Sequence, residues 1–140
     1  MRERGIMMTA FKKCSCCGTV WANLSDLIRD DQVQLIGYQA AFSDSYEGLF
    51  FFSHRTQHCG TTIAIPVSCF SNLYDGPDFT EQLACTDMCN SLCESFFDFG
   101  SCSEACSMRW VREIIEVLNN RGPEEVLARL DGVELHRKSA

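Results

Sequence analysis

The sequence predicts an α+β fold in which a small antiparallel sheet comes first and cysteine-rich helical segments follow it. Two observations lead to this prediction. Three runs rich in β-branched and aromatic residues are separated by turn-forming residues, which is typical of sheet strands. Further along the chain, apolar residues recur at helical spacing. The expected strands cover about 33–42, 48–54 and 61–67, and the expected helical segments cover about 81–97 and 102–119.

The length and composition of the chain indicate one domain. With 140 residues, of which 46% are hydrophobic and 22% charged, the chain has the size and balance of an ordinary globular domain. We therefore expect residues 1–140 to form a single cysteine-rich domain, with loosely ordered ends at 1–10 and 132–140.

Turn and capping residues suggest the element boundaries of the N-terminal half. Ser25 is in position to cap a short helix, and Asp30 with Asp31 ends it. Asp44 and Gly48 supply turn chemistry between the first two expected strands, which favours an antiparallel hairpin. The third strand extends this hairpin to a meander.

The C-terminal half contains one strong helix signal. Ser101 followed by Glu104 matches a capping box, and four apolar residues then recur at helical spacing. Pro123 follows the end of this segment and suits the first turn of a last short helix over 124–130. The four apolar residues are Val111, Ile114, Ile115 and Leu118.

The charge and hydropathy of the chain oppose two classes of partner. The net charge of −7 disfavours nucleic acid and anionic lipid, which carry the same sign. The longest apolar runs, 49–52 and 63–67, are far shorter than a membrane span, so we expect no membrane partner.

The N-terminus lacks the apolar stretch of an export signal, and we expect a cytoplasmic protein. Because cytosolic structural disulfides are rare, its ten cysteines point to metal ligation or redox chemistry.

Four of the cysteines form two equally spaced pairs, Cys89 with Cys93 and Cys102 with Cys106. On a helix, residues four apart lie on one face, so two such pairs can clasp a single centre. Cys102 would occupy the first turn of its helix, where free N–H groups favour a thiolate. Cys85 extends the first pair by one further step, either as a spare ligand or as a redox thiol.

Spacing alone leaves the occupant of this four-cysteine site open. Four thiolates hold a structural Zn²⁺ or an iron–sulfur cluster equally well in principle. The paired motif also resembles the twin motifs of small helical-hairpin proteins, and that resemblance implies disulfides between Cys89 and Cys106 and between Cys93 and Cys102. The gap of eight residues between the pairs is short for that family.

A second candidate site begins at Cys14 and Cys17, which are separated by two residues and followed by Gly18. In such a turn both thiolates approach one ion, and the glycine permits a positive φ. This segment, 14–18, resembles the first half of a zinc-ribbon finger, a resemblance that implies a zinc knuckle. Cys16 is an additional thiol and an alternative ligand.

A tetrahedral site needs two further ligands, which we expect from the middle of the chain. Cys59 and His58 lie at the turn between the second and third strands, with His54 as an alternative to His58. Cys69 lies between apolar residues, and we expect it only to pack in the core.

The sequence shows no pattern of known catalytic machinery, such as a phosphate-binding glycine-rich loop or a nucleophile elbow. Thiol redox chemistry around Cys14 to Cys17 is the one enzymatic possibility left open. The leading interpretation is therefore a small metal-binding protein whose Zn²⁺ is mainly structural and which acts through a protein partner. The alternatives are an iron–sulfur protein for electron transfer or redox sensing, and a disulfide-stapled helical hairpin.

Overall fold

The computed structural model describes residues 10–56, 58–83, 86–89, 91–120 and 122–130. Most of the two ends that were expected to be loosely ordered, 1–10 and 132–140, lies outside this part, as does Cys85. The elements in chain order are the short strands β2 and β3, helix α1, strand β4, the 3-10 helix η1, strands β5 and β6, the 3-10 helices η2 and η3, and helix α2.

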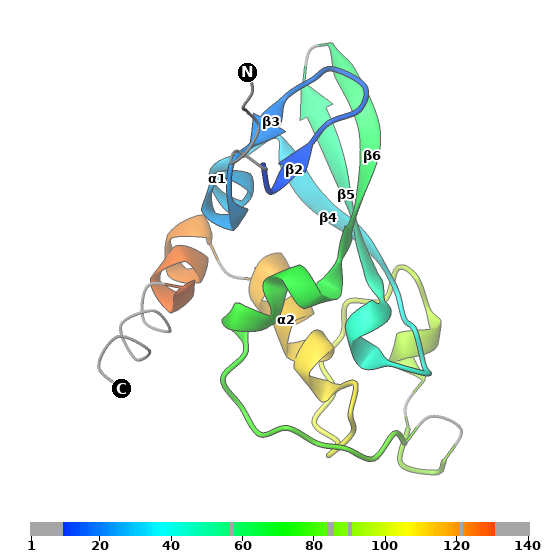
Figure 1. Ribbon diagram of the computed structural model, residues 1–140. Helices are drawn as coiled ribbons and strands as arrows, with labels where there is room; N and C mark the ends of the chain where they lie inside the picture. The colour runs from blue at the N-terminus through cyan, green and yellow to red at the C-terminus, as the bar shows by residue number, and fades with distance from the viewer. Residues whose placement is uncertain (1–9, 57, 84–85, 90, 121, 131–140) are drawn as a thin grey trace, which may run out of the picture.

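The predicted three-stranded sheet is confirmed. It consists of β4 (Val33–Gln39), β5 (Leu49–Thr56) and β6 (Cys59–Pro66), paired antiparallel in that order. The 3-10 helix η1 (Ser45–Glu47) forms the connection between β4 and β5. The long β5–β6 hairpin extends beyond the rest of the molecule, and its turn lies at the top of Figure 1.

One face of this sheet forms the core. Phe50 and Phe52 of β5 lie on it, opposite Ile65 and Ile63 of β6. A register shift between Leu35 and Gly37 of β4 returns the chain to the same face, so that Tyr38 pairs with Phe50 and is also buried. Since side chains alternate along a strand, His54 continues the buried row of Phe50 and Phe52 towards the hairpin turn.

A second, two-stranded hairpin lies beside the outer end of the sheet. It consists of β2 (Lys12–Lys13) and β3 (Val20–Trp21), with residues 14–19 as its loop. Helix α1 (Leu24–Arg29) follows, and its N-cap is Asn23 rather than Ser25. The side chain of Asn23 accepts a hydrogen bond of 2.9 Å from the N–H of Asp26. In Figure 1 the β2–β3 hairpin covers the upper part of β5 and β6.

The inner end of the sheet packs against η2 (Val67–Leu73) and α2 (Arg109–Asn120). The predicted terminal helix is also present, as residues 123–130 are helical. Among the described residues, no helix is both long and apolar enough to cross a membrane.

The prediction of a helical segment at 81–97 is wrong. In the part of 74–108 that the structure describes, the one helical element is the short 3-10 helix η3 (Leu92–Glu94). Some backbone groups here form local turns, but others bond to distant segments. The N–H of Tyr38 bonds to the carbonyl of Phe96 at 2.9 Å, and the N–H of Ser107 bonds to the carbonyl of Glu81 at 2.8 Å. Sequence propensity cannot register such tertiary bonds.

The helix expected at 102–119 exists, but it begins at Arg109, after the predicted capping box. Arginine side chains of α2 bond to carbonyls of the loop that precedes the helix. Arg109 Nη1 donates to the carbonyl of Ser103 at 2.7 Å, and Arg112 Nη2 donates to those of Asp98 and Gly100 at 2.8 and 2.6 Å. Cys102 therefore lies in a loop, not in a first helical turn.

Candidate metal centre

The loop of the β2–β3 hairpin positions two cysteines. The N–H of Cys14 bonds to the carbonyl of Thr19 at 2.8 Å, and the N–H of Gly18 bonds to the carbonyl of Cys14 at 2.9 Å. Gly18 has φ of 83°, a left-handed conformation that glycine adopts without strain. This tight turn, expected from the sequence, leaves Cys14 fully buried and Cys17 exposed.

The outer end of the β5–β6 hairpin supplies two more side chains. Thr56 of β5 pairs directly with Cys59 of β6, so both side chains lie on the same face of the sheet. His54 is two residues from Thr56 and therefore shares that face. Its ring is only 1% exposed and packs edge-on against Trp21 of the other hairpin, with ring centroids 5.0 Å apart.

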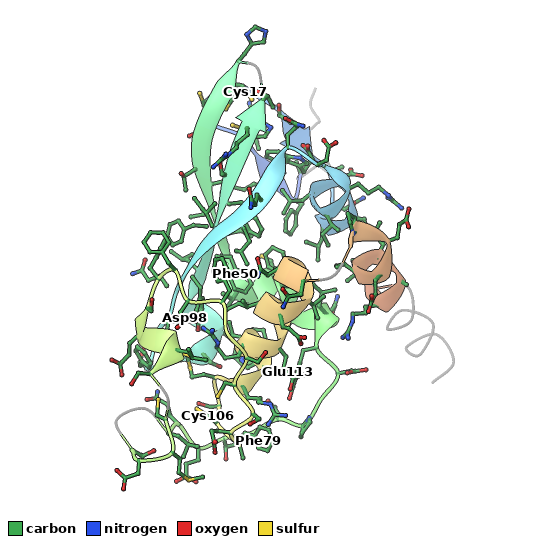
Figure 2. All side chains as sticks on the ribbon, turned by 180° about the vertical axis from the view of Figure 1, so that it is seen from behind. Cys17, Phe50, Phe79, Asp98, Cys106 and Glu113 are labelled. Carbon is green, nitrogen blue, oxygen red and sulfur yellow. The ribbon has the colours of Figure 1, made fainter. Side chains whose placement is uncertain are left out.

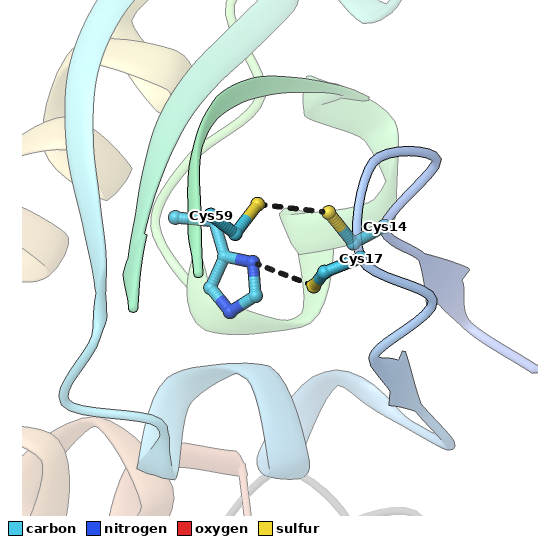
Figure 3. A group of neighbouring side chains, drawn as sticks. Cys14, Cys17 and Cys59 are labelled. Atoms are coloured by element: carbon cyan, nitrogen blue, oxygen red, sulfur yellow. Dashed lines mark hydrogen bonds between the residues drawn. The ribbon is translucent and has the colours of Figure 1, made fainter. Parts of the chain in front are cut away.

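The four side chains meet in one cluster. The ligand atoms of Cys14, Cys17, His54 and Cys59 all lie within 4.8 Å of one another. The Cys14 and Cys59 sulfurs are 3.6 Å apart, and Cys17 Sγ is 3.7 Å from His54 Nδ1 (Figure 3). Sulfurs bound to one zinc at about 2.3 Å would be about 3.8 Å apart at the corners of a tetrahedron. The cluster thus has the composition and spacing of a Cys₃His metal site.

The thiols of this cluster differ in acidity. Hydrogen bonds from the side chain and backbone of Thr19 lower the pKa of the exposed Cys17 thiol to about 7. The N–H of Thr61 lowers the pKa of Cys59, but burial and the neighbouring thiols outweigh it and raise that pKa to about 12. A metal ion would therefore meet one thiol that ionises easily and would displace the proton of another.

The structure brings some of the predicted ligands of this site together and leaves others apart. Cys14, Cys17 and Cys59 come together as expected, and His54, the alternative, completes the set. His58 is exposed and outside the cluster, because it lies in the turn between the two strands and not on the buried face of either. Cys16 is also exposed and is not one of the four.

The prediction for Cys69 was wrong, since this residue is exposed. It belongs to η2, where a repeat of three residues per turn buries Val67, Phe70 and Leu73 along one side. Cys69 lies off that side despite its apolar neighbours.

Among the described residues, only the Cys14, Cys17, His54 and Cys59 group has ligand atoms that converge as at a metal site. The four cysteines of the predicted C-terminal site instead line one small cavity. Its volume is about 20 Å³, and Cys89, Cys93, Cys102 and Cys106 share its walls with Arg112. None of the four lies on an α-helix, so neither the expected helical clasp nor a helical hairpin is formed. The nine described cysteines are all free. Figure 2 places Cys106 and Cys17 near opposite ends of the molecule.

Burial dominates the electrostatics of this second region. It raises the pKa of Cys93 to about 11, an effect that the charge of Arg112 opposes and that Cys102 and Cys106 reinforce. Arg112 itself is only 1% exposed, and its Nη2 donates to two backbone carbonyls, while a side-chain hydrogen bond to Cys93 lowers the pKa of that thiol. The sequence gives no sign that this arginine is buried beside the cysteines.

Comparisons with protein-family models, with curated proteins and with solved structures found no match to this chain. The interpretation of both regions therefore depends on their geometry and chemistry.

Proposed function

We propose that this protein is a small cytoplasmic metal-binding protein in which Zn²⁺ at Cys14, Cys17, His54 and Cys59 fastens the N-terminal hairpin to the sheet. The observation that carries the proposal is the convergence of four ligand atoms within 4.8 Å from two separate hairpins. Sulfur and imidazole ligands in a Cys₃His set are those of structural zinc sites.

The proposed role of the metal is structural because the protein supplies all four ligands. Catalytic zinc sites keep one position for water or substrate, whereas a closed tetrahedral site does not. The β2–β3 hairpin also needs an external fastening. Its strands have two residues each, and an isolated two-stranded hairpin is marginal in water.

We further propose that the protein acts as an accessory or interaction module through a protein partner. Several large apolar side chains are exposed, including Phe97 at 75% and Met88 at 57%. Where such side chains gather into one patch, they mark a site of contact with another protein. The net charge of −7 disfavours nucleic acid as that partner.

Electron transfer or redox sensing by an iron–sulfur cluster is the second candidate function. The specific observation in its favour is that four cysteines surround one cavity. Four thiolates are the usual ligands of such clusters. This candidate and the zinc proposal predict different colours and metal contents.

The test is to purify the protein without oxygen, record its visible spectrum, and measure bound metals and free thiols. The proposal predicts a colourless protein that contains zinc and free thiols. Cys14→Ser should lower the zinc content by one ion per chain. Cys69→Ser removes an exposed cysteine outside both regions and serves as the matched control, with unchanged zinc.

Three results would contradict the proposal in different ways. A brown protein with iron and sulfide would favour the iron–sulfur candidate. A metal-free protein without free thiols would establish disulfides. Equal zinc in Cys14→Ser and wild type would show that the metal lies elsewhere.

A further inference from the structure

The buried polar atoms without hydrogen-bond partners in the described part of the chain gather at one place. They are the phenol oxygen of Tyr38 and the Nε and Nη1 atoms of Arg112. Arg112 lines the cavity of the four cysteines, and Tyr38 lines a second pocket that shares Cys93 with it. Both residues are about 1% exposed.

Buried polar groups in proteins are nearly always hydrogen-bonded, and buried charges are paired. A guanidinium that keeps two donor atoms free inside the fold therefore calls for a negatively charged acceptor. Four thiolates around a divalent ion carry a net charge of about 2−, from four negative sulfurs and one doubly positive ion. Such a centre would accept hydrogen bonds from Arg112 and from the Tyr38 hydroxyl.

Backbone donors already point at two of the sulfurs. The N–H of Ser91 lies 3.3 Å from Cys89 Sγ, and the N–H groups of Leu83 and Met108 lie 3.3 and 3.5 Å from Cys106 Sγ. N–H groups directed at sulfur favour a thiolate and are part of the surroundings that tune metal ligands.

The size of the cavity limits its occupant. Its volume of about 20 Å³ is little more than the 10–15 Å³ or so that one water needs. This suits a single ion better than a cluster of several iron and sulfur atoms.

From these observations we propose a second metal centre, in which Cys89, Cys93, Cys102 and Cys106 bind one divalent ion such as Zn²⁺ and Arg112 with Tyr38 hydrogen-bonds the thiolates. It is separate from the Cys₃His centre and does not depend on it. Arg112 and Tyr38 are positioning residues, since they would touch the sulfurs and not the ion.

The first test uses the wild-type chain and needs no variant. The cysteines are alkylated with and without Zn²⁺, and each modified position is measured by mass spectrometry. We expect Zn²⁺ to protect Cys89, Cys93, Cys102 and Cys106, while Cys69 reacts equally in both conditions. Unchanged reaction of these four cysteines would overturn the second centre. Protection of Cys14, Cys17 and Cys59 reports separately on the first centre, so the two proposals fail independently.

The second test examines the positioning residues with Tyr38→Phe, which removes one hydroxyl and keeps the buried ring. If the centre exists, chelator competition should show weaker binding of one of two zinc ions, by up to about 10–100-fold. Arg112→Met should weaken the same ion, and Arg112→Lys should partly restore it. Unchanged zinc affinity in Tyr38→Phe and Arg112→Met would overturn the positioning role of these two residues. Iron with sulfide in the wild-type protein would overturn the proposal that the second centre holds a single ion.

Discussion

The two cysteine regions of this protein differ in what brings their ligands together. At the outer end, two hairpins fix Cys14, Cys17, His54 and Cys59 so firmly that the ligand atoms already meet within 4.8 Å. At the inner end, Cys89, Cys93, Cys102 and Cys106 come from loops and turns and surround a cavity. Strand pairing positions the first set, whereas the second set depends on tertiary contacts of a long irregular segment.

This difference suggests different consequences for the two metals. The described part of 74–108 has no regular element other than the short η3, and so long an irregular stretch is uncommon in a compact domain and usually has a functional reason. We infer that a metal at the inner end orders the described part of 74–108, while a metal at the outer end fastens the short β2–β3 hairpin to a sheet that is already formed. The following predictions test this comparison.

The largest effect is expected from His54→Ala. This substitution removes a buried ring that packs against Trp21 together with a ligand, and should lower the free energy of unfolding by about 2–5 kcal/mol with metal present. Urea unfolding with parallel zinc analysis measures both losses. His58→Ala is the matched control, since His58 is exposed and should change stability by less than about 0.5 kcal/mol. Loss of zinc in His58→Ala but not in His54→Ala would refute the assignment from strand faces.

Metal removal should affect the two regions unequally. An ion present at about 100 times its Kd contributes about 2.7 kcal/mol, so a chelator should speed local amide exchange about 100-fold where the ion maintains the structure. We expect that increase over 74–108 and a much smaller one in the centre of β5. Hydrogen exchange read by mass spectrometry gives this map directly. A uniform increase along the chain would mean that both regions unfold as one unit.

Gly37→Ala should loosen the inner segment from the sheet. A Cβ at Gly37 would lie 1.9 Å from the Phe96 ring, which packs on the back of the sheet against Phe51. Displacing this ring should cost about 1–3 kcal/mol. Thermal unfolding measures the cost, and Gly60→Ala provides a control with no atom within 4 Å of the new methyl group. If both variants unfold alike, the contact with Phe96 is unimportant.

The smallest effect is expected from Asn23→Ala at the start of α1. The loss of its bond to the Asp26 N–H should lower the free energy of unfolding by about 1 kcal/mol. Metal content should stay as in the wild type, because α1 supplies no ligand to either region. A fall in zinc would show that the outer centre relies on this helix.

Local sequence signals predicted the sheet and three of the four residues of the outer site, Cys14, Cys17 and Cys59. The strands at about 33–42, 48–54 and 61–67 are present because alternation and turn residues are local properties. Gly18 after the Cys14–Cys17 pair indicated the tight turn, and the turn has the expected positive φ. His54 was also within reach, since counting in steps of two from Phe50 and Phe52 puts its ring on the buried face.

Tertiary structure alone decided the inner region. In place of the expected helix at 81–97 the chain forms short turns, with some backbone groups bonded to β4 and to other loops. Helix α2 begins at Arg109, and the side chains of Arg109 and Arg112 bond to carbonyls of the loop before it. The burial of Arg112 beside four cysteines has no local signal either. The sequence by itself therefore determined which cysteines are paired in spacing and where strands form. Only long-range contacts brought His54 to the cysteines of the N-terminal hairpin and decided which charge the inner cysteines face.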